Sequence, residues 1–218
     1  MRIHSTRQRR AGFTLLEIAI TVALLGLVLG GLTGVLDSTG KTYSQGSAQS
    51  RVQADTRRAV DRVAAELENC GLSTLTPVPT NVAAIDLVFQ GSTGVDAATG
   101  LITWGNSTRL QLLYEVGEIN NGLDDDGDGL VDEGRVVLTR NNLMAGQQSI
   151  TLVKGVAELL EGETANGADD NGNGLNDERG FCMTLQGSLL FLRLTLARRV
   201  TEDRSVDASV VTAIRLKN

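Results

Sequence analysis

The feature that most constrains this chain is an apolar segment at residues 13–36 that contains one charged residue, Glu17. As a helix, this segment is long enough to cross the roughly 30 Å hydrocarbon layer of a membrane. It is longer than the apolar region of an ordinary secretory signal, and its far end lacks a convincing small-residue cleavage site. Residues 1–12 before it are basic, with arginines at positions 2, 7, 9 and 10. This charge bias predicts a single membrane span with a cytoplasmic N-terminus and an exported C-terminal domain.

Glu17 is the fifth residue of the apolar segment. A carboxylate inside a bilayer costs about 2.5–3.5 kcal/mol even on lenient insertion scales, so it should have a partner. The alternative is a side chain that only reaches back to the cytoplasmic interface, as in a generic anchor.

Residues 9–17 read RRAGFTLLE and resemble the class III signal of type IV prepilins and type II secretion pseudopilins. In that family a basic leader ends in Gly, cleavage exposes Phe, and Glu is the fifth residue of the mature chain. The resemblance implies that a prepilin peptidase removes the leader 1–12 by cutting between Gly12 and Phe13 and then methylates the new amine of Phe13. It also implies that Glu17 pairs with the N-terminal amine of a neighbouring subunit during assembly.

The helical pattern continues beyond the membrane segment into an amphipathic part at residues 37–71. Its predicted buried face consists of residues spaced three or four apart: Val52, Thr56, Val60, Val63 and Leu67. We therefore expect one helix over residues 13–70, ended by Gly71 and the nearby prolines.

The remaining residues, 72–218, are expected to form a β-rich periplasmic domain. The predicted strands are 84–90, 109–116, 135–140, 149–160, 189–198 and 208–216. Alternation is plainest at Leu190, Leu192, Leu194 and Leu196, and at Val210, Thr212, Ile214 and Leu216. This pattern favours an α+β fold in which a long N-terminal helix packs on an antiparallel sheet. The resemblance implies the same outline, the pilin fold.

Residues 37–72 resemble the amphipathic helix of W-type minor pilins and of the related J-type secretion pseudopilins. Major pilins of the family usually carry Pro near the position of Gly34, which argues against the main structural subunit. The W-type minor pilin is the favoured interpretation.

Two acidic loops, 118–133 and 163–178, contain segments that align without a gap at an offset of 45 residues. In each, oxygen-bearing side chains alternate around a glycine, as in the first half of an EF-hand calcium loop. The predicted Ca²⁺ ligands are Asp124, Asp126, Asp128, Leu130 through its carbonyl, Asp132 and Glu133 in the first loop, and Asp169, Asn171, Asn173, Leu175, Asp177 and Glu178 in the second.

Neither loop has the usual glutamate at the twelfth position, where Arg135 and Gly180 stand. Closure of the site is therefore assigned to Glu133 and Glu178. If the strands alternate in direction, both loops leave the same end of the sheet. The alternative is a pair of solvated polar turns.

The two cysteines, Cys70 and Cys182, lack the short spacing of a redox or zinc motif. In an oxidising periplasm we expect them to form a disulfide if the fold brings them together; the alternative is two buried free thiols.

The only histidine, His4, lies in the leader, so histidine chemistry is excluded from the mature chain. No nucleophile–base pair is evident, and the chain is expected not to be an enzyme.

Three functions remain open at this point: a minor pilin in type IV pilus assembly, tip formation or adhesion; a type II secretion pseudopilin; and a pilin-anchored, calcium-dependent adhesin. The expected partners are other pilin or pseudopilin subunits, prepilin peptidase and the inner membrane. Nucleic acid is not expected as a partner, because the net charge is -6 even with the basic leader present. The expected location is the inner membrane, with the C-terminal domain in the periplasm, and then a pilus or pseudopilus.

Overall fold

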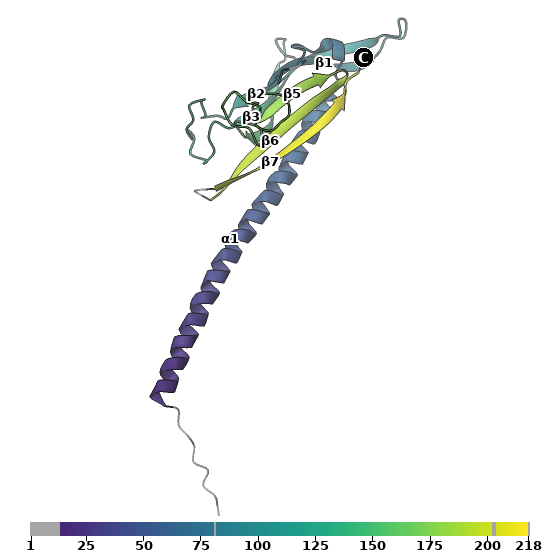
Figure 1. The fold of residues 1–218 in the computed structure, drawn as a ribbon. Helices are drawn as coiled ribbons and strands as arrows, with labels where there is room; N and C mark the ends of the chain where they lie inside the picture. Colours follow the sequence, from purple (N-terminus) through teal and green to yellow (C-terminus); the bar gives the residue numbers. More distant parts are fainter. Residues whose placement is uncertain (1–13, 81, 202–203, 218) are drawn as a thin grey trace, which may run out of the picture. The chain divides into compact units, whose positions relative to one another are not determined.

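The computed structural model of the protein describes residues 14–80, 82–201 and 204–217. The chain divides into two compact units after Ser44. Helix α1, Leu15–Leu67, contributes its first part to one unit and its second part to the other. Figure 1 shows α1 and the strands of the second unit.

The first unit is the apolar part of α1. Every described side chain in it, residues 14–44, is exposed to solvent in the single chain. Among the described residues, α1 is the one helix long and apolar enough to cross a membrane. Exposure of so much apolar surface is unfavourable in water, so this unit fits a helix that lipid or other subunits cover.

The second unit contains a seven-stranded antiparallel sheet in the order β1-β2-β3-β4-β6-β5, with β7 paired to the other edge of β6. The strands are β1 Asp86–Val95, β2 Ile102–Tyr114, β3 Gly134–Arg140, β4 Gln148–Val156, β5 Phe181–Gln186, β6 Leu189–Thr201 and β7 Arg204–Arg215. The α+β prediction is therefore confirmed. Six of these strands were predicted from the sequence, and β5 was not among the predicted ranges. Strands β1, β2, β6 and β7 are longer than predicted, and β4 is shorter.

The second part of α1 packs one face into the core of this unit. The predicted face is confirmed, because Val52, Thr56, Val60, Val63 and Leu67 are all buried, together with Ala59. Leu190, Leu192 and Leu194 of β6 are fully buried in the same core. Alternate strand residues point to one face of a sheet, so this side of β6 and the apolar face of α1 remove each other from water.

The end of α1 differs from the prediction. The helix stops at Leu67 and not at Cys70, and its expected first residue, Phe13, lies outside the described residues. Cys70 instead forms a β-bridge with Gly91, and its carbonyl accepts a hydrogen bond from the Lys217 amide at 3.0 Å. Backbone groups of the sheet thus replace the last helical hydrogen bonds.

Both cysteines are buried free thiols, so the structure does not contain the expected Cys70–Cys182 disulfide. Cys70 belongs to the core cluster that includes Phe181 and Met183. Because neighbours along a strand point to opposite faces, Cys182 between those two residues points away from that core. Burial raises the pKa of Cys70 to about 11 and that of Cys182 to about 12, so both thiols stay protonated at neutral pH.

The two acidic loops leave the sheet side by side. Tyr114 at the end of β2 pairs with Gly134 at the start of β3, and Gly134 pairs with Val156 at the end of β4. The second loop then closes on itself through the bridge between Leu159 and Arg179 before β5 begins. The expectation that both loops share one end of the sheet agrees with this register (Figure 1).

Candidate functional sites in the N-terminal segment and the acidic loops

The described chain begins just after the predicted processing site. Gly12 and Phe13 lie outside the described residues. Thr14 and Glu17 form a capping box at the start of α1: the Glu17 amide donates to the Thr14 hydroxyl at 3.2 Å, and the Thr14 amide donates to a Glu17 carboxylate oxygen at 3.5 Å. These bonds satisfy two of the amide groups that a helix start leaves without partners.

Glu17 thus has a local role that the sequence interpretation did not consider. None of the ion pairs among the described residues includes the Glu17 carboxylate. The side chain is exposed on an otherwise apolar helix. The capping hydrogen bonds are made within the chain, but the negative charge of Glu17 has no cationic partner in the described part of it.

In the first acidic loop, three aspartates turn their carboxylates inward onto the backbone. Asp124 accepts hydrogen bonds from the amides of Gly127 at 2.7 Å and Gly129 at 2.8 Å. Asp126 and Asp128 each accept the amide two residues further on, at 3.0 and 2.9 Å. One oxygen from each of the three carboxylates lies within 4.8 Å of the others.

The second loop repeats this geometry with fewer charges. Asp169 accepts the amides of Gly172 and Gly174, as Asp124 does in the first loop. The backbone also matches, because Gly129 and Gly174 both have φ of 89° and Asp132 and Asp177 have φ of 50° and 49°. A left-handed φ of this size favours glycine, so the repeated glycine is a structural requirement of both loops.

Leu130 and Leu175 follow these glycines, and their amides donate to the side chains of Asp128 and Asn173 at 2.9 and 3.0 Å. Asn171 accepts the Asn173 amide at 3.0 Å. The structure therefore places the predicted pairs of ligands at equivalent points of the two loops.

Asp132 and Asp177 connect the end of each loop to its beginning. Both oxygens of Asp132 accept backbone amides, from Asn121 at 3.0 Å and Gly122 at 2.8 Å. Asp177 does the same with Asn166 and Gly167 at 3.1 and 2.7 Å. Asp132 does not join the group formed by the other three aspartates within the described residues. Its contacts indicate a residue that fixes the loop rather than one that faces an ion.

Two further glutamates belong to the loops, and the sequence interpretation assigned them no role. Glu118 accepts the amides of Asp125 and Asp126 at 2.9 Å and that of Asp132 at 3.2 Å. Glu163 accepts the amides of Asn171 and Asp177 at 3.1 and 3.2 Å. Both glutamates are buried, and they stand at the same offset of 45 residues as the rest of the repeat. That offset is the signal that could have found them.

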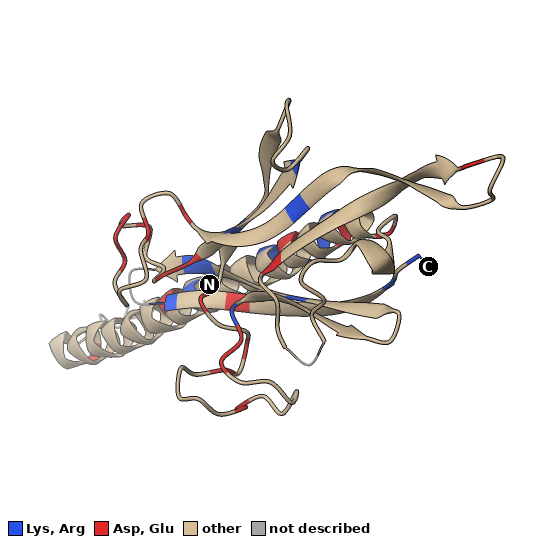
Figure 2. Ribbon diagram, turned by 90° about the horizontal axis from the view of Figure 1, so that it is seen from above, with Lys and Arg blue, Asp and Glu red and all other residues tan. Residues whose placement is uncertain are grey.

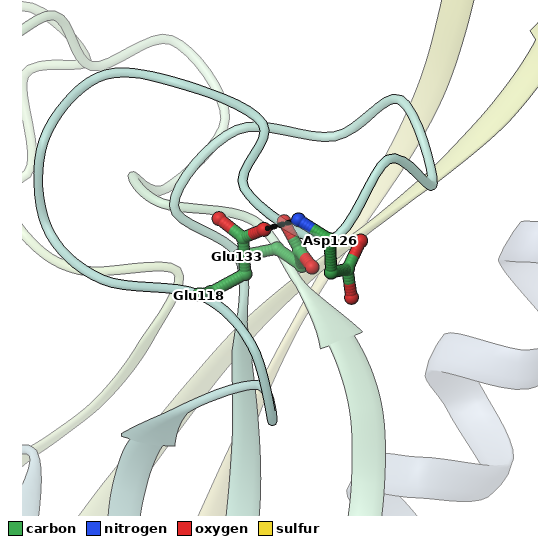
Figure 3. Close-up of side chains that lie close together, drawn as sticks. All are labelled: Glu118, Asp126 and Glu133. Atoms are coloured by element: carbon green, nitrogen blue, oxygen red, sulfur yellow. Dashed lines mark hydrogen bonds between the residues drawn. The ribbon is translucent and has the colours of Figure 1, made fainter.

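Glu133 and Glu178, just before β3 and β5, are the exceptional residues. They are 1% and 3% exposed. Among the described residues, no hydrogen-bond partner reaches either carboxylate oxygen of either side chain. Figure 3 shows Glu133 beside Glu118 and Asp126, and one oxygen from each of these three carboxylates lies within 4.8 Å of the others.

The electrostatics of Glu133 follow from this position. Burial raises its pKa to about 7, and the nearby carboxylates of Asp128, Glu118 and Asp126 act in the same direction. Buried charges in proteins are normally paired or bound to a metal, and no described residue is a hydrogen-bond partner of the Glu133 carboxylate.

The bases of the two loops also contact one another. The guanidinium of Arg179, at the end of the second loop, stacks 4.8 Å from the ring centre of Tyr114, at the start of the first. Glu115 accepts the Gly155 amide at 2.9 Å and pairs with Lys154 at 3.2 Å. These contacts tie both loops to the same end of the sheet, and Figure 2 shows acidic residues along the loops outside the strands.

A family model described as the prokaryotic N-terminal methylation motif matches residues 7–33. Searches of curated proteins and of solved structures gave no significant match. The matched segment covers the predicted cleavage junction, Glu17 and most of the apolar segment. Such a signal implies processing by prepilin peptidase and assembly with other pilins. The chain therefore carries a type IV prepilin-like signal followed by a long helix and an antiparallel sheet, the arrangement of a type IV pilin or pseudopilin.

Proposed function

We propose that this chain is a minor subunit of a type IV pilus, of the W type, which acts in pilus assembly or at the pilus tip. After cleavage between Gly12 and Phe13, α1 anchors it in the inner membrane and then enters the filament. The observation that carries the proposal is the methylation motif at residues 7–33 on a helix whose first unit exposes every described side chain.

The exposed first unit supports an assembling subunit. Apolar side chains such as Leu16 and Leu27, 70% and 76% exposed, need an apolar environment. Lipid supplies it before assembly, and helices of neighbouring subunits supply it in a filament. The Glu17 carboxylate is costly in both surroundings unless a cation from another chain reaches it. A membrane anchor alone does not explain why the one charge of the segment stands there.

Two alternatives share this anchor. A type II secretion pseudopilin has the same signal and the same type of fold. An adhesin that uses the anchor only for display is favoured by one observation, the pair of acidic loops at one end of the sheet. The resemblance of residues 37–72 to W-type minor pilins, and Gly34 in place of the usual proline, support the minor pilin.

Deletion of the gene in the native host, with complementation by the wild-type gene, distinguishes the three functions. We expect surface pili to be lost and exported proteins to remain normal. Normal pili with failed protein export would instead indicate a pseudopilin. Normal pili and export with lost adhesion would indicate the adhesin. Complementation with a variant that cannot be processed at Gly12 should fail in each case, which shows whether the effect depends on the prepilin pathway.

A further inference from the structure

Each acidic loop surrounds a buried glutamate whose charge has no partner in the described chain. We propose that each loop binds one calcium ion and that Glu133 and Glu178 are ligands to it, in place of the twelfth-position glutamate of an EF-hand. The other side-chain ligands are Asp124, Asp126 and Asp128 in the first loop, and Asp169, Asn171 and Asn173 in the second.

The two buried glutamates without partners are stronger evidence for a bound cation than the aspartates are. The aspartates and Glu118 are satisfied by backbone amides, so their contacts are compatible with ordinary polar turns. Glu133 and Glu178 are nearly inaccessible, and none of their four carboxylate oxygens has a partner among the described residues. Burial of an ionised carboxylate without compensation is strongly unfavourable, and a bound cation removes that penalty. Both loops contain such a glutamate, at equivalent positions of the repeat.

In the first loop the carboxylates form two groups that share Asp126, and each group is small enough to hold one ion. Two oxygens on one calcium ion can be no further apart than twice the metal–oxygen distance of about 2.3–2.6 Å. In the first loop, the groups Asp124–Asp126–Asp128 and Glu118–Asp126–Glu133 each bring their ligand oxygens within 4.8 Å. Asp126 belongs to both groups and so links the aspartates to the buried glutamate (Figure 3).

The donor set favours calcium over other metals. The predicted ligands are all oxygens, from carboxylates, amides and backbone carbonyls, and the mature chain beyond the leader contains no histidine. Zinc and copper prefer nitrogen and sulfur ligands. Magnesium requires near-ideal octahedral geometry and retains water, whereas calcium accepts the many oxygens of a flexible loop.

The two sites should differ in affinity. Asp126 and Asp128 of the first loop correspond to Asn171 and Asn173 of the second, which offer neutral oxygens. The first site therefore gains more from the ion's charge and should bind more tightly. Both dissociation constants are expected in the range of extracellular modules, about 0.1–1 mM.

The test uses the full chain in detergent, depleted of metal with EDTA and then titrated with calcium chloride by calorimetry. Thermal unfolding is measured in parallel. We expect one ion per loop. Each occupied site should raise the melting midpoint by about 3–6 °C when free calcium is ten times its dissociation constant. Magnesium chloride at the same concentration and ionic strength should give a much smaller shift.

The variants Glu133→Gln and Glu178→Gln keep the shape of the side chain and remove its charge. Each should abolish one calcium site or weaken it by at least about tenfold, and leave the other site intact. In EDTA each variant should unfold at the same temperature as the wild type or higher, because an unpaired buried charge is gone. The matched control is Asp125→Asn, which removes one charge from the first loop at a residue that contacts Asn121 and not the aspartate group.

Any of four results would overturn the proposal. The first is the absence of calcium binding to the wild type at 10 mM, roughly ten times the upper end of the expected range. The second is full calcium binding by the double variant Glu133→Gln, Glu178→Gln. The third is an equal loss of binding in Asp125→Asn, which would indicate general attraction by the loop's charge. A variant that is destabilised in EDTA would likewise contradict the ligand role, since it would show that the buried charge stabilises the metal-free fold.

Discussion

At the residue scale, Glu17 has one observed role and one proposed role, and substitution can separate them. Its carboxylate completes the capping box with Thr14, and its charge is available to a cation from another subunit. Glutamine also serves at this position of a capping box, so Glu17→Gln keeps the helix start and removes only the charge. We expect this variant to be cleaved and inserted normally but to be largely absent from filaments, as measured by immunoblots of sheared pili and of membranes.

Thr14→Ala is the matched control, because it removes the cap and keeps the charge. Loss of such a cap costs about 0.5–2 kcal/mol of helix stability. Filament incorporation should remain close to that of the wild type. If Thr14→Ala fails as severely as Glu17→Gln, the helix start and not the charge is what assembly requires.

At the scale of elements, the segment that follows α1 makes one close contact with β2. Gly71, which was expected to end the helix, is extended with φ of -87° and ψ of 131°. A Cβ at this position would lie 2.3 Å from an atom of the Trp104 ring. The glycine is therefore required because an indole packs against it, and not because of its φ.

This contact predicts the effect of Gly71→Ala. The added methyl must displace the ring or the backbone, at a cost of about 1–3 kcal/mol in the free energy of unfolding. Trp104 is the only tryptophan, so its fluorescence spectrum should also shift in the native state. Gly91→Ala serves as the control, because a Cβ there meets nothing within 4 Å. An unchanged spectrum and stability in Gly71→Ala would contradict the packing.

At the scale of the whole molecule, the proposed processing removes the first twelve residues and changes the net charge. The leader 1–12 carries four arginines, and their loss lowers the formal net charge from -6 to -10. We expect mass spectrometry of the protein from the native host to find an N-terminal peptide that begins at Phe13 and carries one methyl group on its amine.

Gly12→Leu should block this step and leave the full-length precursor in the membrane, because the resemblance places the cut directly after this glycine. Wild-type protein from a host without prepilin peptidase should accumulate as the same precursor. Wild-type protein that retains Met1 in the native host would refute the proposed processing.

Local patterns of the sequence were sufficient for several features. The apolar segment, the buried face of α1 and the alternation in β6 each depend on residues a few positions apart, so their spacing reveals them. The repeat of the acidic loops is visible for the same reason. β5 was not recognised because five successive residues, Phe181 to Leu185, are buried on both faces, which leaves no alternation to detect.

Tertiary structure decided the features that depend on residues far apart in the chain. Helix α1 ends at Leu67 because backbone groups near Gly91 and Lys217 bind the next residues, and the cysteines stay apart because strand alternation turns Cys182 from the core. The burial of Glu133 and Glu178 without hydrogen-bond partners also depends on residues far apart in the chain. The sequence by itself determined which residues carry oxygen atoms that could bind a cation. Only the fold determined which carboxylates accept hydrogen bonds from backbone amides and which are buried without a partner.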